Sequence, residues 1–317
     1  MKKIRNCSVV IPVYNSAQIL PELIERLQKS LAGSVRQYEI ILVNDGSRDQ
    51  SWEVIEELCG RHPGLRGIDL LRNYGQGNAL LRGIIAARHE IIVTMDDDLQ
   101  HPPEEIPKLL AELERGYDVV YGYAEVEGHD VKRTFASRLI KKLMRLIVST
   151  PGIERSGPFR AFRTHLRDGF ADFRNPYVSI DVLLSWSTTR YSHVPVRHDR
   201  RKSGKSNYNL RKLITHALNL LLGFSTLPLR LASLLGFFLT LFGMGVLLYV
   251  IGYMLFHGSP VQGFTFLASL ISIFSGVQLF ALGIIGEYLA RMYIQLMQRP
   301  VYAVRAEVNS ASKTSKR

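Results

Sequence analysis

Three consecutive aspartates, Asp96, Asp97 and Asp98, follow the apolar run Glu90–Met95. Carboxylates packed this closely repel one another and raise one another's pKa unless a cation offsets them. Side chains alternate along an extended segment, so we expect Asp96 and Asp98 on one side, where they can hold a hard divalent ion, Mg²⁺ or Mn²⁺. The spacing leaves open an aspartate-rich helix N-terminus before Pro102-Pro103.

Further polar groups follow other apolar runs, at Pro12–Asn15, Asn44–Ser47 and Arg72–Gly77. Short apolar runs that alternate with helical patterns indicate βαβ units and a mostly parallel sheet. The expected strands are Cys7–Val13, Glu39–Val43, Leu65–Leu71, Glu90–Met95 and Val119–Tyr121, with helices near 16–33, 49–60, 75–88 and 103–115. Ligands bind outside the carboxyl ends of such strands, where these polar groups would gather. Asp45 has an ordinary alternative, because Asp-Gly-Ser is a common turn.

A long segment without Asp, Glu, Lys or Arg runs from Leu231 to Gly286 and divides near 257–263, where His257 lies. Each part, about 231–256 and 264–286, is long enough to cross a bilayer as a helix, so we expect two transmembrane helices. The connecting loop has no Lys or Arg, whereas basic residues flank both spans, which predicts that both termini are cytoplasmic. Residues 288–317 are then a basic cytoplasmic tail, of which 309–317 are expected to be disordered.

The net charge of +12 predicts an anionic partner. Residues 131–150 place apolar and basic side chains on opposite faces, as in a helix that lies in an anionic membrane interface, and 210–229 are a second such candidate. The basic loop 200–207 suits either a pyrophosphate or anionic lipid. No nucleic-acid recognition motif is present, and Cys7 and Cys59 are too few for a disulfide framework or a cysteine zinc site.

Together these motifs resemble the family 2 glycosyltransferases of the GT-A fold, in the branch that moves a sugar from a nucleotide onto a polyprenyl phosphate. The chain is similar to undecaprenyl-phosphate 4-deoxy-4-formamido-L-arabinose transferases, and also to bactoprenol glucosyl and dolichol-phosphate mannosyl transferases. The resemblance rests on segments spread over nearly the whole chain: 9–15, 43–47, 72–76, 95–107, 201–206, 286–293 and 299–300.

The resemblance implies a site built from matching positions. Pro12, Tyr14, Asn15 and Asp45 would hold the nucleoside, with Asp45 on the base. Asp96 and Asp98, helped by Gln100, would hold Mg²⁺ or Mn²⁺, and Arg201 would contact the diphosphate. The middle residue of the Asp-x-Asp motif is usually small in this family, and here it is Asp97, which adds a charge beside the nucleotide sugar.

The expected reaction is inverting transfer from a nucleotide sugar, UDP-linked in similar proteins, to undecaprenyl phosphate at the cytoplasmic face of the inner membrane. The lipid phosphate is already ionised and would attack directly, with Asp98 and Arg201 as catalytic residues and Arg133 and Arg138 on the acceptor phosphate.

The expected architecture is an α/β GT-A catalytic domain, 1–209, then a juxtamembrane helix, 210–229, and two spans within 230–287. Two alternatives stay open: a processive polysaccharide synthase of the same fold and a non-catalytic membrane sensor of nucleotide sugars. Membrane lipids are expected partners and nucleic acid is not, and the sequence leaves open a homo-oligomer.

Overall fold

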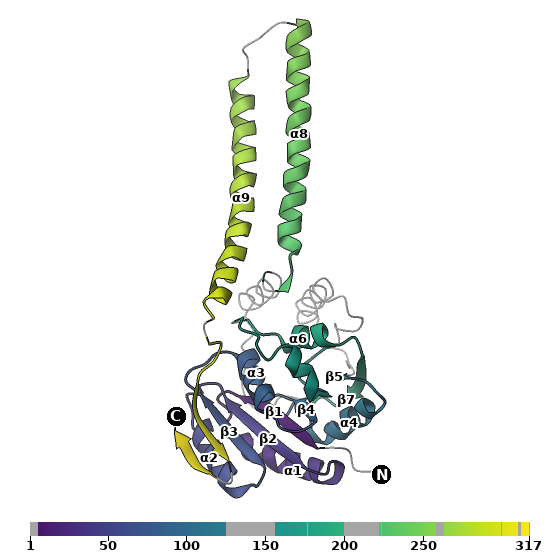
Figure 1. Cartoon of the computed structure of the whole chain (residues 1–317), viewed down its shortest axis with the longest axis vertical. Coiled ribbons are helices and arrows are strands. Elements are labelled where there is room, and N and C mark those ends of the chain that lie inside the picture. Colours follow the sequence, from purple (N-terminus) through teal and green to yellow (C-terminus); the bar gives the residue numbers. More distant parts are fainter. Residues whose placement is uncertain are drawn as a thin grey trace. The chain divides into compact units, whose positions relative to one another are not determined.

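The computed structural model in Figure 1 describes residues 6–124, 156–175, 177–199, 222, 224–257, 263–298, 300–309 and 312–316. The chain forms two compact units, which are described separately. The first contains residues 1–213 and returns at 299–317, and the second contains residues 214–298.

The first unit is built on a nine-stranded sheet in the order β7-β5-β6-β4-β1-β2-β3-β8-β9. Its centre is four parallel strands, β4-β1-β2-β3, joined through helices as the alternating apolar runs predict. Their bounds are β1 Cys7–Val13, α1 Leu20–Ser34, β2 Tyr38–Asn44, α2 Ser51–Arg61, β3 Leu65–Leu70, α3 Gln76–Ala86 and β4 Ile91–Thr94. The expected mostly parallel α/β sheet is confirmed, and the ends of these four strands differ from the expected ends by at most one residue.

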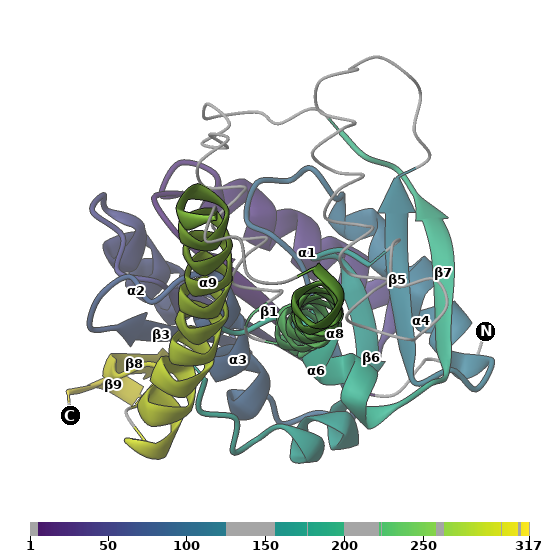
Figure 2. The same ribbon diagram turned by 90° about the horizontal axis from the view of Figure 1, so that it is seen from above.

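Alternate residues of each central strand pack on opposite faces of the sheet, because side-chain direction alternates along a strand. Val9 and Ile11 of β1 join a core closed by α1, α2 and α4, whereas Val10 joins a core closed by α3 and α6. Figure 2 shows β1 between α1 and α3. Burial on both faces explains why these strands are continuous apolar runs.

Antiparallel strands complete both sides of the parallel centre. β6 pairs with β4 and β5, and β5 pairs in parallel with β7. The bounds on this side are the short helix η1 Pro103–Glu105, α4 Ile106–Glu114, β5 Val119–Ala124, β6 Arg160–Arg163, η3 Thr164–Gly169, α6 Ile180–Ser187 and β7 Tyr191–Val196.

The C-terminal segment corrects the sequence prediction of a disordered end, because Asn309 and residues 312–316 lie in strands. β8 (Val304–Asn309) pairs antiparallel with β3, and β9 (Ser312–Lys316) pairs with β8. Ala306 and Val308 of β8 are buried, so pairing with the free edge of β3 brings apolar surface into the core.

The second unit contains two long helices, α8 (Leu227–His257) and α9 (Phe264–Leu296). Stretches of both, Leu227–Val246 and Ile273–Leu296, are apolar and long enough to cross a membrane. The two helices contact each other, for example where Gly243 leaves room for the ring of Phe274. Their large apolar side chains are exposed, as in Leu248 and Phe280, which suits helices surrounded by lipid.

Several predicted features lie outside the residues that the structure describes. These are the interfacial helix at 131–150 with Arg133 and Arg138, the basic loop 200–207 with Arg201, and most of the segment 210–229.

Candidate active site

The carboxyl ends of β1, β2, β3 and β4 carry the loops that hold the expected site residues. Backbone hydrogen bonds tie these ends together, from Asp45 N to Val13 O at 2.9 Å and from Met95 N to Val10 O at 3.3 Å. The structure thus brings together the polar groups that follow separate strands in sequence, as expected for an open parallel sheet.

Asp45 lies directly after β2 and is only 3% exposed. Its carboxylate accepts hydrogen bonds from the backbone N–H groups of Tyr74 (2.7 Å) and Gly75 (2.9 Å). Burial raises the pKa of Asp45, while these two hydrogen bonds oppose the rise. Asp45 therefore fixes the loop after β3 against the loop after β2.

Gly46 is required at this junction. Its φ of +63° belongs to the left-handed region, and an added Cβ would lie 2.5 Å from the backbone of Arg72 and of Asn73. Only glycine combines this conformation with so close an approach of two loops.

The loop after β1 presents Tyr14 and Asn15, which are both exposed. Asn15 adopts φ +56°, donates its N–H to Ser47 Oγ at 3.0 Å, and accepts a hydrogen bond from Arg48 N at 2.8 Å. Pro12 differs, because it is buried within β1 opposite Val43. Its ring is buried rather than on the surface, and its contact with a nucleoside stays a prediction.

Of the three aspartates after β4, Asp96 and Asp97 point to different partners. The Asp97 carboxylate accepts hydrogen bonds from Tyr14 N (3.2 Å) and Ser16 Oγ (2.6 Å), so it fastens the β1 loop. Asp96 instead accepts a hydrogen bond from Gln76 Nε2 at 2.6 Å. The carboxylate of Asp97 is therefore hydrogen-bonded to the loop after β1. A direct contact between Asp97 and the nucleotide stays a prediction.

Asp98 is 8% exposed and accepts a hydrogen bond from the backbone N–H of Gln100 at 3.1 Å. Leu99 between them has φ +57°, which is rare for a branched side chain and reverses the backbone at this point. The reversal folds the backbone of Gln100 back toward Asp98, and a shared metal site for Asp96, Asp98 and Gln100 stays a prediction.

The electrostatics of this turn favour a cation. Burial, Asp98 and Asp97 together raise the pKa of Asp96 to about 7, against the opposing effects of Arg160 and Gln76. In the part of the chain that the structure describes, no three acidic, His or Cys side chains cluster around one point. Two carboxylates and an amide oxygen nevertheless fit Mg²⁺ or Mn²⁺, which commonly takes few protein ligands and completes its shell with water and phosphate oxygens.

Two supporting groups had no role assigned from the sequence. Gln76 caps Asp96 from the first turn of α3. His198 stacks on His101 at 4.9 Å and contacts Gln100 O at 3.1 Å, so it braces the aspartate turn from the end of β7. Their contacts join segments distant in sequence, and local pattern gives no signal for them.

Comparison with known proteins agrees with this geometry. Residues 8–170 match the family described as Glycosyl transferase family 2. The chain belongs to this family.

Among relatives, this glycosyltransferase is similar to the undecaprenyl-phosphate 4-deoxy-4-formamido-L-arabinose transferase of Shewanella sediminis, with 36% identity over 94% of this chain and 91% of that protein. The enzyme of the same description from Klebsiella pneumoniae is 34% identical, over 99% of this chain and 97% of that protein.

Among solved structures, it resembles Mycobacterium tuberculosis glucosyl-3-phosphoglycerate synthase in complex with Mn²⁺, UDP and glucosyl-3-phosphoglycerate. The TM-score is 0.53 at 19% identity, covering 69% of this chain and 78% of that one. The likeness confirms the GT-A-like fold.

Proposed function

We propose that this enzyme transfers a sugar from a UDP-linked donor to undecaprenyl phosphate, giving a lipid-linked sugar for modification of the cell envelope. The main support is that relatives described as undecaprenyl-phosphate transferases match 94–99% of the chain, including both long apolar helices. A soluble acceptor would need no such helices.

The donor site is assigned to the joined strand ends. Tyr14 is 44% exposed beside the buried Asp45 and offers an aromatic face for a base, while Asn15 and Asp45 offer polar partners for the nucleoside. Asp96, Asp98 and Gln100 would hold Mg²⁺ or Mn²⁺, which would offset the negative charge of the diphosphate as it departs. The Mn²⁺ and UDP of the similarly folded synthase agree with this assignment.

The acceptor supplies its own nucleophile. A phosphate monoester has a second pKa near ~6, so one of its oxygens is already anionic at neutral pH and attacks the anomeric carbon as the bond to the nucleoside diphosphate breaks. This direct displacement inverts the anomeric configuration. Asp98 is the proposed catalytic carboxylate, because as a metal ligand it would lie beside the departing diphosphate.

Three basic residues are assigned from sequence alone. Arg201 would stabilise the departing diphosphate, and Arg133 and Arg138 would hold the acceptor phosphate at the bilayer surface. The basic residues that flank the two spans favour an arrangement in which the catalytic unit and both termini are cytoplasmic.

The test is transfer in membranes that contain the protein, supplied with undecaprenyl phosphate, Mn²⁺ and a panel of nucleotide sugars, with the lipid product weighed by mass spectrometry. One UDP-sugar should yield a mass equal to undecaprenyl phosphate plus one glycosyl unit. Asp98→Asn should abolish the product, whereas Glu114→Gln, an exposed change on α4, should preserve it. Nucleotide binding without any glycolipid would favour the sensor, and products with many sugar units would favour the processive synthase.

A further inference from the structure

Arg305 lies in a β-bulge of the strand that follows α9. Ala306 pairs with Asp69 and Val304 pairs with Leu70, so Arg305 is the extra residue on β8. Bulges redirect side chains, and here Arg305 Nη1 lies 3.4 Å from Asp69 Oδ2 while Nη2 donates to Leu71 O at 3.0 Å. The guanidinium thus covers the carboxyl end of β3.

Asp69 depends on this cation. The residue is 1% exposed, and its Oδ1 accepts a hydrogen bond from Asn44 Nδ2 at 2.7 Å. Its Oδ2 is buried and accepts no hydrogen bond from the described residues, and the charge of Arg305, 3.4 Å away, compensates it. Burial raises the pKa of Asp69, while Asn44 and Arg305 oppose that rise.

The contact continues from Asp69 to the nucleoside side of the site. Asn44 Oδ1 accepts a hydrogen bond from Ser47 N at 3.3 Å, and Ser47 Oγ accepts one from Asn15 N at 3.0 Å. Asp45 lies between Asn44 and Ser47 in the same turn. A continuous series of polar contacts therefore runs from Arg305 to the residues assigned to the nucleoside.

We propose that Arg305 is a positioning residue for the nucleoside pocket, acting through Asp69 and Asn44 on the turn that carries Asp45. The inference rests on the proposed function, since it takes the nucleotide to bind at this turn. It means that the segment following the second apolar helix sets the affinity for the donor, although it contributes no side chain to the substrate.

The test compares variants of the full-length protein in detergent, with UDP binding in the presence of Mn²⁺ measured by calorimetry and KM and kcat measured for the donor. Arg305→Met should weaken UDP binding by about tenfold and raise the KM to match, with kcat nearly unchanged. Arg305→Lys should restore part of the affinity, because an ammonium group can pair with Asp69 but lacks the planar fork that also serves Leu71 O.

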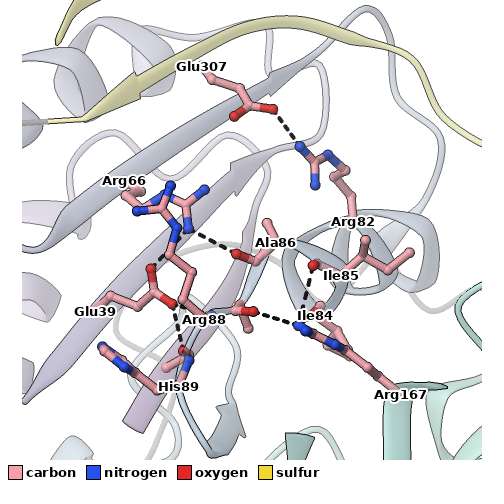
Figure 3. A network of polar contacts seen from close by, with 12 residues as sticks. Glu39, Arg66, Arg82, Ile84, Ile85, Ala86, Arg88, His89, Arg167 and Glu307 are labelled. Carbon is pink, nitrogen blue, oxygen red and sulfur yellow. Dashed lines mark hydrogen bonds and ion pairs between the residues drawn. The ribbon is translucent and has the colours of Figure 1, made fainter. Parts of the chain in front are cut away.

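Glu307→Gln is the matched control on the same strand. Glu307 pairs with Arg82 of α3 and so attaches β8 to that helix (Figure 3), whereas the printed ion pair of Asp69 is with Arg305. Because Glu307 is 45% exposed, its loss should change UDP affinity by less than about threefold.

Two results would overturn the inference. The first is a UDP affinity in Arg305→Met equal to that of wild type. The second is equal weakening of UDP binding in Arg305→Met and Glu307→Gln, which would mean that β8 affects the pocket only through its attachment to the sheet. If the wild-type protein itself binds no UDP, the proposed function fails, and the inference fails with it.

Discussion

Replacing Asp96 with asparagine should stabilise the metal-free enzyme above neutral pH. In the wild-type protein, burial and the charges of Asp98 and Asp97 raise the pKa of Asp96 from its usual 3.8 to about 7. Asparagine has nearly the same shape and can accept the hydrogen bond from Gln76, but it carries no charge. The substitution therefore isolates the cost of the carboxylate.

The sign and size of the effect follow from proton linkage. Between pH 3.8 and about 7, the folded state retains a proton on Asp96 that the unfolded state has lost, so the free energy of unfolding falls as pH rises. A shift of about three pH units corresponds to at most about 4 kcal/mol, all of it lost by pH 8. The free energy of unfolding of Asp96→Asn does not fall in this way, because asparagine has no titratable proton to lose.

Tryptophan fluorescence can report the effect on the catalytic unit alone, because Trp52 and Trp186 are the only tryptophans and both belong to that unit. Without divalent ions at pH 8, the Tm of Asp96→Asn should exceed that of wild type by up to about 10 °C, and the gap should close toward pH 4. Burial also raises the pKa of Asp45 and Asp181 in both proteins, so the difference between the proteins is the quantity to measure.

Glu114→Gln is the control, since it removes one carboxylate from an exposed position on α4 and should follow wild type at every pH. Mn²⁺ at pH 8 should raise the Tm of wild type more than that of Asp96→Asn. The reasoning is refuted if Asp96→Asn is no more stable than wild type at pH 8. It is also refuted if the Tm of Asp96→Asn falls as steeply as that of wild type when the pH is raised from 4 to 8.

Two further predictions concern the loops around the aspartates. Asp97→Ala removes two hydrogen bonds from the β1 loop and should weaken UDP binding by at least about tenfold in calorimetry, and unchanged affinity would contradict the role assigned to Asp97. Gly46→Ala should lower the free energy of unfolding by about 2 kcal/mol or more, because its φ is +63° and its Cβ would meet the Arg72 backbone. Gly33→Ala, in open space on α1, should leave thermal stability unchanged or raise it slightly, and equal losses in both variants would refute the steric argument.

The parallel centre of the sheet could be predicted from sequence because its strands are buried on both faces and read as apolar runs. Cys7–Val13 matches β1 at both ends, and β4 ends at Thr94, one residue before the expected end at Met95. Asp96 and Asp97 have different hydrogen-bond partners, as expected for neighbours that point different ways. Asp97 and Asp98 lie in a turn beyond the strand, so the grouping of Asp96 with Asp98 around a metal stays a prediction.

The remainder depends on contacts that local sequence does not encode. β8 reads Val-Arg-Ala-Glu-Val-Asn, a mixed and charged segment, and it becomes a strand because the edge of β3 supplies its hydrogen-bonding partner. The attachment of Asp45 to the backbone of Tyr74 and Gly75 likewise appears only once two strand ends are side by side.

The pairing of β8 with β3 also imposes an order on biosynthesis. β3 ends at Leu70 and its partner begins at Val304, so both apolar helices are made in the interval. At synthesis rates of about 5–20 residues per second, the edge of β3 waits for roughly 12–50 s before it is covered. The nascent catalytic unit must therefore remain soluble with an open edge while the helical hairpin is inserted, and a ribosome that stops before residue 304 releases a chain whose sheet is incomplete.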